Sequence, residues 1–264
     1  MKLVTRRLVQ LISLPLLIVP ALAFAGSSSG STSHAKLKLS GTITVSAASS
    51  LTASFTQIGA KFHKEYNNTT IVFNFGSSTT LASQVLSGAP ADVYASADLS
   101  DMDTLVSAGY VQVAPKVFAR NQMEIAVKPG NPMNISGLSS LSTVGVVALC
   151  AATAPCGIYA ANVLKRAGVT IPTSSITRQP NSTSTVDQVS YGDANAALVY
   201  VTDVNGQGTL VSGVKIPLNQ NTIADYPIAP LTTSANPKLA KAFIAFVEST
   251  NGQRSLKAQG FLAP

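Results

Sequence analysis

Histidine and cysteine are scarce in this sequence, which has two of each among 264 residues. A Ser-His-Asp triad would have to use His34 or His63, and neither lies beside a turn suited to a nucleophile. Two cysteines also lack the third and fourth ligands that a zinc ion needs. We therefore expect no catalytic residue, no bound cofactor and no metal ion held directly by side chains.

Runs of basic residues are missing as well. The chain has 18 Lys and Arg against 11 Asp and Glu, a formal net charge of +7, and these charges are scattered. Proteins that bind nucleic acids usually cluster Lys and Arg or interleave them with aromatic residues. The sequence shows neither pattern, so we expect no nucleic-acid partner.

The beginning of the chain has the pattern of a cleavable signal peptide. Residues 1–25 start with three basic residues, continue as an apolar run, and end in the small-x-small motif Ala23-Phe24-Ala25. A membrane span is the alternative, but the run is short, holds two prolines and precedes a Gly-Ser segment. Thr5-Arg6-Arg7 also fits a twin-arginine signal, although an ordinary basic region looks the same.

Export would change what remains of the chain. Cleavage after Ala25 removes three positive charges and leaves a net charge of +4. Residues 26–39 begin as a Gly, Ser and Thr segment, typical of a flexible tether. No cysteine stands immediately after the cleavage site, so nothing predicts a lipid anchor. We expect a periplasmic or otherwise extracytoplasmic protein.

The first half of the body repeats one small unit. Residues 42–45 alternate polar and branched apolar side chains, which predicts a strand, and the Ser/Ala turn 46–50 follows. An apolar run at 71–75 leads into the Ser/Thr turn 76–80, and 91–95 is a third strand. Strands alternating with helices predict parallel βαβ units, with ligands at the carboxyl ends of the strands. Apolar residues at helical spacing follow the first turn: Leu51, Phe55, Ile58, Phe62 and Tyr66.

A second α/β set begins after the Pro- and Gly-rich segment 128–132. We expect a strand at 123–127 before this segment and strands at 144–149, 176–178, 196–201 and 226–231 after it. We also expect helices after 155 and 182, and two closing helices around 239–247 and 253–259.

Four turns share one chemistry: residues 46–50, 76–80, 154–157 and 181–185. Each precedes an expected helix, and none contains Lys, Arg, Asp, Glu or His. Unpaired N–H groups and the positive end of the helix dipole make a helix N-terminus a site for anions. The alternative is that each turn only caps its own helix. If the turns converge, uncharged donors from both halves of the chain would hold an anion.

Motifs in these turns resemble those of the periplasmic molybdate-binding proteins, the substrate receptors of molybdate ABC transporters. The resemblance covers about residues 40–264 and implies an α/β, two-lobed type II periplasmic binding protein fold. Each lobe would be a mixed, mostly parallel sheet flanked by helices, and two crossover strands would join the lobes. We expect lobe 1 at 40–122 and 222–264, and lobe 2 at 123–221. The matching segments are Ala47-Ala48-Ser49-Ser50-Leu51-Thr52, Gly76-Ser77-Ser78-Thr79-Thr80-Leu81-Ala82, Gly88 to Asp98, Pro155-Cys156-Gly157-Ile158-Tyr159-Ala160, Leu198-Val199-Tyr200 and Gly260-Phe261.

The resemblance also implies which groups bind the oxyanion. The family's two serine ligands fall on Ser50 and Ser78, and its tyrosine hydroxyl falls on Tyr200. One backbone N–H falls on Cys156, where a small residue such as Ala is more familiar. A second falls near Ser182, and Asn181 or Thr183 are alternatives because this segment aligns poorly.

The implied ligand is molybdate or tungstate, and the implied partner of a monomeric receptor is an ABC permease. The residues themselves support a fully deprotonated oxyanion, because a protonated oxygen would need an acceptor and the four turns contain no Asp or Glu. Asp92 and Asp98 are expected to structure their own turn, and His63 to be a solvated helix residue.

Cys150 and Cys156 are six positions apart. In an oxidising compartment they can form a disulfide that closes a small loop and shapes the turn at Cys156. Two free buried thiols are the alternative.

Three other functions are compatible with the sequence. The first is a receptor for sulfate or another small tetrahedral oxyanion. The second is an exported enzyme on the same scaffold, although the turns offer only hydroxyls and Tyr200 as reactive groups. The third is a sensor whose closed form docks to a signalling partner.

Overall fold

The computed structural model describes residues 38–264, which form one compact unit. The expected signal peptide (1–25), His34 and most of the expected tether (26–39) lie outside the described residues. At the end of the tether segment, Leu39 is buried against the core. Over residues 38–264, no helix combines the length and apolar character required to cross a bilayer.

The strands form one curled mixed sheet in the order β2-β1-β3-β9-β4-β7-β5-β6, with β8 beside β4. Two sets of three strands are parallel, β2-β1-β3 and β6-β5-β7, and each set is extended by antiparallel strands. The bounds are β1 (Gly41–Ala48), β2 (Thr69–Gly76), β3 (Val93–Ala95), β4 (Lys116–Val127), β5 (Val147–Cys150), β6 (Ile176–Gln179), β7 (Ala196–Tyr200), β8 (Ser212–Lys215) and β9 (Ile223–Pro230).

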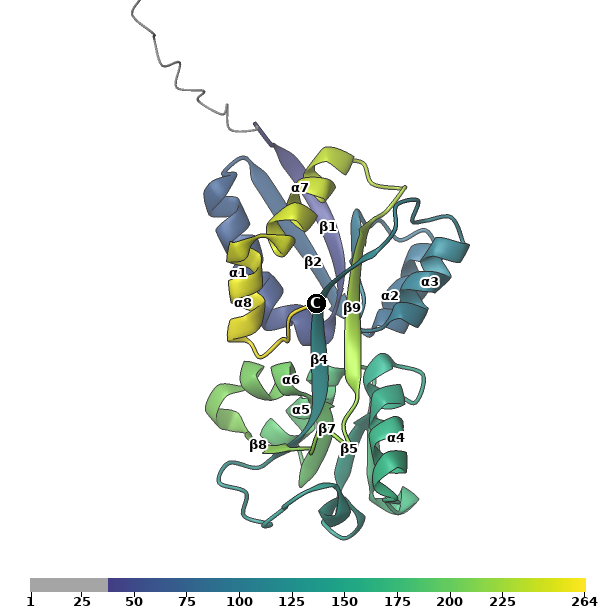
Figure 1. Ribbon diagram of the computed structural model, residues 1–264, viewed down its shortest axis with the longest axis vertical. Coiled ribbons are helices and arrows are strands. Elements are labelled where there is room, and N and C mark those ends of the chain that lie inside the picture. Colours follow the sequence, from purple (N-terminus) through teal and green to yellow (C-terminus); the bar gives the residue numbers. More distant parts are fainter. Residues whose placement is uncertain (1–37) are drawn as a thin grey trace, which may run out of the picture. The chain divides into compact units, whose positions relative to one another are not determined.

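Two long strands run between the two lobes (Figure 1). β4 pairs with β9 from Lys116 to Gln122 and then with β7 and β8 from Met123 to Val127. β9 pairs with β3 at its other end. These crossover strands therefore join two separate parallel sets into one sheet, as expected for the type II periplasmic binding protein fold.

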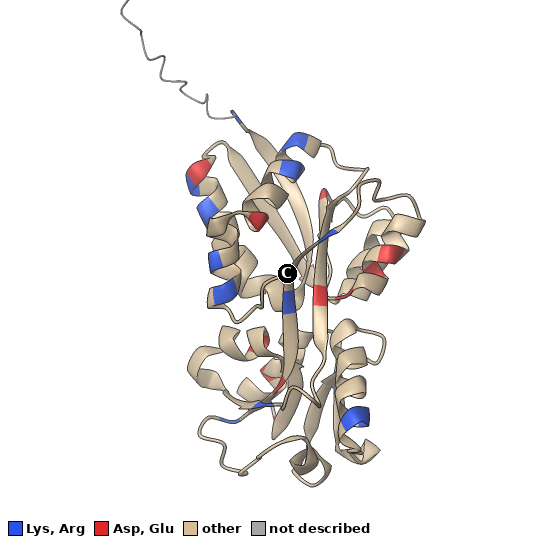
Figure 2. Ribbon diagram, viewed as in Figure 1, with Lys and Arg blue, Asp and Glu red and all other residues tan. Residues whose placement is uncertain are grey.

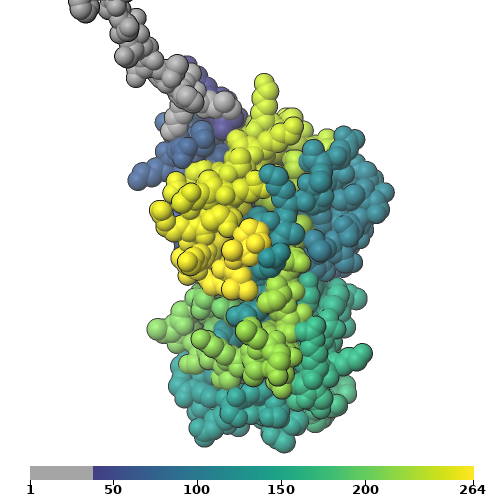
Figure 3. Space-filling model, viewed as in Figure 1, coloured from purple at the N-terminus to yellow at the C-terminus, as the bar shows by residue number. Residues whose placement is uncertain are grey.

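Helices cover both faces of the upper lobe in Figure 1. Helices α1 (Thr52–Glu65), α7 (Pro237–Glu248) and α8 (Thr250–Ala258) pack on one face, and α2 (Ser78–Leu86) and α3 (Leu99–Ser107) on the other. Figure 3 shows α7 and α8 as a continuous outer layer of this lobe. The predicted stripe on α1 is confirmed, since Leu51, Phe55, Ile58 and Phe62 are fully buried.

In the lower lobe, alternate strand residues face opposite helices. Ile125, Val147 and Leu198 belong to the large core that also holds α4 (Pro155–Ala167). Ala126, Ala148 and Val199, each one position away on the same strands, pack with α5 (Ser182–Ser190) and α6 (Val201–Gly206). This period of two is the geometry of a strand buried on both faces.

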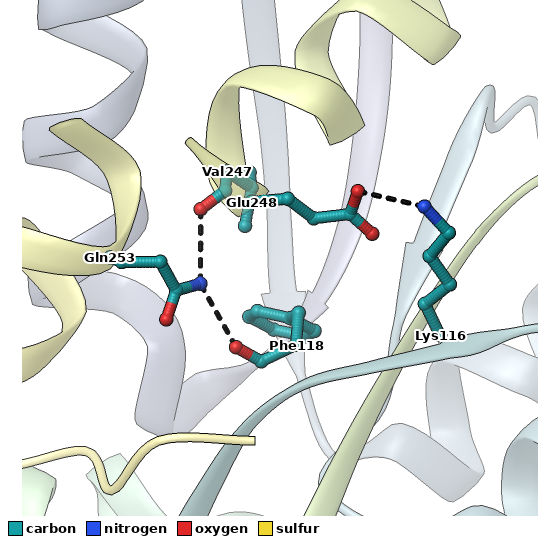
Figure 4. Close-up of polar contacts among 5 residues, drawn as sticks. All are labelled: Lys116, Phe118, Val247, Glu248 and Gln253. Atoms are coloured by element: carbon teal, nitrogen blue, oxygen red, sulfur yellow. Dashed lines mark hydrogen bonds and ion pairs between the residues drawn. The ribbon is translucent and has the colours of Figure 1, made fainter. Parts of the chain in front are cut away.

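The C-terminal helices are attached to the crossover strand β4. Gln253 Nε2 donates to the carbonyl oxygens of Phe118 on β4 (3.0 Å) and Val247 on α7 (3.2 Å) (Figure 4). Lys116 and Glu248 form an ion pair of 3.0 Å beside this contact. The end of the chain is also tied to β4 by two backbone hydrogen bonds between Arg120 and Leu262, of 3.0 and 2.8 Å. Because the lysine side chain is mostly exposed, the ion pair adds little to these contacts.

The predicted strands and helices are all present, and the sequence-based bounds need three corrections. β4 begins at Lys116 and not near 123, because Arg120, Asn121 and Gln122 interrupt the apolar pattern although they are paired in the ladder. The short helix α6 and the strand β8 were not predicted, since six and four residues carry little periodicity.

Candidate functional site

Parts of all four uncharged turns line one small cavity. The five predicted residues Ser50, Ser78, Cys156, Ser182 and Tyr200 are all among its lining residues. The remaining lining residues are small or uncharged: Ala48, Ser49, Gly76, Ser77, Ala97, Pro155 and Asn181. The structure therefore brings together every residue that the sequence placed at the site.

The topology explains why these turns meet. β1, β2, β5 and β6 each lead into a helical turn within a few residues of their carboxyl ends. β1 and β2 are parallel to each other, and so are β5 and β6. The carboxyl ends of parallel strands lie at one edge of a sheet, where ligands bind in open α/β sheets. Because the crossover strands set the two edges face to face, helix N-termini from both lobes border the cavity.

Within residues 38–264, the Ser78 hydroxyl accepts a hydrogen bond but donates to no other group. Its Oγ accepts a hydrogen bond of 2.9 Å from the backbone N–H of Ala97. A serine hydroxyl can accept one bond and donate another. The Tyr94 hydroxyl donates to the carbonyl oxygen of Ser78 at 2.8 Å and fixes the start of α2. Ser78 is therefore held in place with its O–H available to the cavity.

Ser50 is the middle residue of the 3₁₀ turn Ser49–Leu51. Its Oγ is 2.8 Å from the hydroxyl oxygen of Tyr226 on β9. Both side chains are buried. A serine from one segment is thus tied to a residue of a crossover strand.

At the start of α4, one N–H remains for a ligand. Pro155 has no N–H, and the N–H groups of Gly157 and Ile158 donate to the carbonyl oxygen of Ala154. The first N–H groups of a helix have no intrahelical acceptor, which leaves that of Cys156. A Cβ at Gly157 would come within 2.0 Å of the carbonyl oxygen of Ala151, so only glycine permits this tight turn.

The N–H groups at the start of α5 can be examined in the same way to compare residues 181, 182 and 183 as the second backbone donor. Asn181 Oδ1 accepts from Ser184 N–H at 2.9 Å, and the Asn181 carbonyl accepts from Thr185 N–H. Thr183 N–H donates to Ser49 Oγ at 3.4 Å. The N–H of Ser182 is the remaining first-turn donor. The geometry thus favours Ser182 over Thr183, whereas the bonds that Asn181 accepts do not engage its own N–H, so Asn181 stays an alternative.

The hydroxyl of Ser182 is not directed at a ligand. Its Oγ donates to Asp203 Oδ1 at 2.8 Å and lies 3.0 Å from Ser49 Oγ on the opposite lobe. The other oxygen of Asp203 accepts from Tyr200 N–H at 3.0 Å. Ser182 can therefore offer its N–H to the cavity, while its side chain joins the two lobes.

Tyr200 supplies a buried hydroxyl without a partner. Among residues 38–264 its Oη makes no hydrogen bond, although the side chain is almost fully buried. Burial raises the pKa of Tyr200, so the phenol keeps its proton. An unpaired buried donor in a cavity wall is costly unless a ligand accepts from it.

One carboxylate lies behind the cavity wall. Burial raises the pKa of Asp203 to about 7, and the hydrogen bonds from Ser182 and the Tyr200 N–H oppose this rise. The sequence-based analysis missed Asp203, because it follows Tyr200 in a helix too short to recognise.

Additional contacts cross the cleft near its edge. Thr79 Oγ1 lies within hydrogen-bond distance of Asp101 Oδ2 (2.9 Å) and of the Thr153 carbonyl oxygen (3.0 Å) on the other lobe.

Burial, followed by the charge of Asp98, raises the pKa of Asp101 to about 6. Asp98 caps α3 by accepting from Asp101 N–H, and Asp92 accepts from Thr44 N–H. Asp98 thus structures its own turn, as predicted. For Asp92 the prediction is wrong, because its carboxylate accepts from Thr44 on β1 and from Ser234 and so joins distant segments.

Charged side chains lie mainly on the outer helices. In Figure 2, basic residues mark α1, α7 and α8, and acidic residues mark α3. None of the cavity's lining residues is charged. Over the described range 38–264, no group of three His, Cys, Asp or Glu side chains is placed to hold a metal ion. His63 is exposed on α1, and its Nδ1 contacts the Thr69 carbonyl oxygen.

Cys150 and Cys156 form a disulfide, the first of the two alternatives considered for them. It joins the end of β5 to the first turn of α4, and both residues are buried. The bond thus lies directly behind the Cys156 N–H.

Three residues around the site were not singled out by the sequence. Ser49 stands in the first turn, while Asn121 and Tyr226 lie on the crossover strands. No local pattern marks a buried Asn or Tyr within a strand as part of a distant site, so contact across the sheet was needed to find them.

Comparison with known proteins places the chain in a family. The family model for bacterial extracellular solute-binding proteins matches residues 43–262. The molybdate-binding protein ModA of Mycobacterium tuberculosis (strain ATCC 25618 / H37Rv) is 34% identical over 250 residues, which cover 94% of this chain and 95% of that protein.

Solved structures share the fold. The Azotobacter vinelandii periplasmic molybdate-binding protein has a TM-score of 0.76 at 19% identity, over 84% of this chain and 99% of that one. The sulfate-binding protein SubI from M. tuberculosis H37Rv has a TM-score of 0.75 at 19% identity, over 83% and 86%. These matches confirm the resemblance seen in the sequence motifs, and the chain belongs to the bacterial extracellular solute-binding proteins.

Proposed function

We propose that this protein captures molybdate, and also tungstate, between its two lobes and delivers the oxyanion to an ABC permease. The observation that carries the proposal is the set of uncommitted donors around one uncharged cavity: the hydroxyls of Ser50, Ser78 and Tyr200 and the N–H groups of Cys156 and Ser182. The 34% identical relative is named as a molybdate-binding protein, which supports the choice of ligand.

Hydrogen bonds from these five donors supply enough free energy to bind an oxyanion tightly. A hydrogen bond to a charged group contributes about 1.5 to 3 kcal/mol, so five give on the order of 8 to 15 kcal/mol before costs. Micromolar to nanomolar binding corresponds to about 8 to 12 kcal/mol. Desolvation and closure reduce the gross value, and no cation is required to reach this range.

The donor set also favours a fully deprotonated ion. Asp203 contacts two of the lining residues, and its two oxygens already accept hydrogen bonds from the Ser182 hydroxyl and the Tyr200 N–H. A protonated ligand oxygen would find no free acceptor there. Phosphate and its monoesters, with a pKa of about 6, are therefore disfavoured relative to molybdate or tungstate.

We further propose that the lobes are residues 40–122 with 222–264 and residues 123–221, and that they close as units around the ion. The support is that β4 changes partner between Gln122 and Met123, and that β9 begins at Ile223. In this view the protein acts as an exported monomer, with residues 1–25 as its signal.

Calorimetry with molybdate, tungstate and sulfate tests the function. We expect tight binding of the first two, and a loss of about 10- to 100-fold in Ser50→Ala and in Ser78→Ala with the fold retained, because each removes one charge-assisted bond. Tight sulfate binding with indifference to molybdate would instead identify a sulfate receptor, whose fold this chain also shares.

A further inference from the structure

A buried chain of hydrogen bonds leads from the crossover strands to Ser50. Asn121 Nδ2 lies 3.3 Å from Tyr226 Oη, which lies 2.8 Å from Ser50 Oγ. Tyr226 pairs with Ala119 across the β4–β9 ladder, and Asn121 is two residues further along β4. Residues two apart on a strand share a face, so Asn121 and Tyr226 meet diagonally.

The orientation of the Asn121 amide is fixed by a backbone group. The N–H of Gln122 donates to Asn121 Oδ1 at 2.9 Å, and a backbone N–H can only donate. The other end of the amide is therefore the NH₂ group. It donates to Thr202 Oγ1 at 2.9 Å and to Tyr226 Oη at 3.3 Å. Toward Tyr226, Asn121 is a donor.

This orientation fixes the direction of the next bond. Within residues 38–264, the Tyr226 hydroxyl has hydrogen bonds with Asn121 and Ser50. Because Asn121 donates to it, its own hydrogen has only Ser50 Oγ as an acceptor. If Ser50 donated instead, a buried phenol hydrogen would be left unpaired, which proteins avoid. Burial also raises the pKa of Tyr226, so the hydrogen stays in place.

We propose that Asn121 and Tyr226 are positioning residues that set the direction of the Ser50 hydroxyl, so that Ser50 accepts from Tyr226 and donates its own hydrogen to the bound oxyanion. This inference rests on the proposed function. A donor that is already oriented needs no reorganisation when the anion enters. Without Tyr226 the hydroxyl would have to be ordered by the ligand, which costs affinity.

Ser78 shows the same arrangement with a different partner. Its Oγ accepts from the Ala97 N–H, a group that cannot reverse its role. Both serines thus accept one hydrogen bond from the protein and keep one hydrogen for the cavity. At Ser78 the donor is a backbone N–H, which can only donate. At Ser50 the donor is the Tyr226 hydroxyl, which is limited to donating because it already accepts from Asn121.

A double-mutant cycle with sodium molybdate tests the relay. Tyr226→Phe keeps the ring and removes the hydroxyl, and we expect roughly a fivefold or greater loss of affinity in the otherwise natural protein. In the Ser50→Ala background the same change should cost less than about twofold, because the residue through which it acts is gone. Thermal unfolding without ligand, recorded for all variants, establishes that each is folded.

Two further variants separate positioning from packing. Asn121→Leu removes the amide that makes Tyr226 donate to Ser50. We expect it to lower the molybdate affinity of the otherwise natural protein but not that of the Ser50→Ala variant. Thr202→Val is the matched control, because it removes the other acceptor of Asn121 Nδ2 without touching Tyr226 or Ser50. Its affinity for molybdate should stay within about twofold of the natural protein.

The outcomes are distinguishable. If the losses from Tyr226→Phe and Ser50→Ala multiply, or if Thr202→Val weakens binding as much as Asn121→Leu, the relay is overturned while the proposed function stands. If Ser50→Ala binds molybdate unchanged, Ser50 is not a ligand and the relay fails while the proposed function stands. If the natural protein ignores molybdate, the proposed function fails and the relay fails with it.

Discussion

The hydroxyl oxygens of Ser49 and Ser182 lie 3.0 Å apart, although 133 residues separate them in the chain. Ser182 gives its hydrogen to Asp203, so Ser49 must donate to Ser182. The carbonyl oxygen of Ser49 also lies 3.2 Å from Thr183 Oγ1, which donates to it. Ser49 therefore joins the lobes, while its neighbour Ser50 faces Tyr226 and the cavity.

This division of roles predicts different effects for two adjacent serines. Ser49→Ala removes a neutral hydrogen bond of about 1 kcal/mol from the closed form, so we expect roughly a fivefold loss of molybdate affinity. Stopped-flow measurements should show the loss mainly as faster release. Ser50→Ala should cost more, because it removes a bond to the charged ligand. A larger loss in Ser49→Ala than in Ser50→Ala would contradict the assignment.

Tyr200→Phe should change stability and binding in opposite directions. The Tyr200 hydroxyl is buried without a partner among the described residues, and removing such a group relieves a cost of about 1 to 3 kcal/mol. The ligand-free variant should therefore unfold at a higher temperature than the natural protein. Its molybdate affinity should fall about 10-fold or more, because a donor to the anion is gone.

Tyr94→Phe is the control for this pair of effects. The Tyr94 hydroxyl is equally buried, but it already donates to the Ser78 carbonyl oxygen. Its removal should lower the unfolding temperature. If Tyr200→Phe behaves in the same way, its hydroxyl is satisfied within the protein and does not serve the ligand.

Local patterns were enough to predict most of the fold. The stripe from Leu51 to Phe62 marked α1 because it repeats at helical spacing, and the small polar turns marked the ends of the strands. The first half of β4 was missed because Arg120, Asn121 and Gln122 look like a loop. Their place in the sheet depends on pairing with β9, more than 100 residues away.

The local chemistry of the site was predictable only as far as its turns. The small polar turns before the helices indicated anion donors, and the family resemblance supplied the individual residues Ser50, Ser78 and Tyr200. Asp203 and Tyr226 lie near the site through tertiary contact alone. No spacing in the sequence connects Tyr226 to Ser50, which precedes it by 176 residues.

Asp203 should make binding depend on pH. Its pKa is raised to about 7 because it is buried, so it loses its charge as the pH falls through this value. A nearby bound dianion disfavours the charged carboxylate further, and binding is therefore coupled to proton uptake. Molybdate affinity should rise between about pH 8 and pH 6, by at most about tenfold per pH unit for one proton.

Asp203→Asn is the control for this dependence. The amide keeps an oxygen that can accept from Ser182 but carries no charge, so the pH profile between about 6 and 8 should become flat. The stability of the folded protein should change with pH in the same direction as the molybdate affinity of the natural protein. Because folding raises the pKa of Asp203, this group stabilises the fold at pH values below the pKa that it has in the unfolded chain. The stabilisation is lost as the pH rises toward about 7, the pKa in the folded protein. A profile unchanged by Asp203→Asn would assign the dependence to Asp101.

The disulfide should contribute to both stability and binding. Replacing both Cys150 and Cys156 by alanine keeps the N–H at position 156 and opens a loop of six residues. The loop-entropy relation gives about 2 kcal/mol for such a loop, which urea denaturation will measure as a lower midpoint at unchanged slope. The N–H would then be less well ordered, so molybdate affinity should fall a few fold. Reducing agent should weaken the natural protein and leave the variant unaffected, whereas two alkylated thiols in the folded, unreduced protein would show that the cysteines are free.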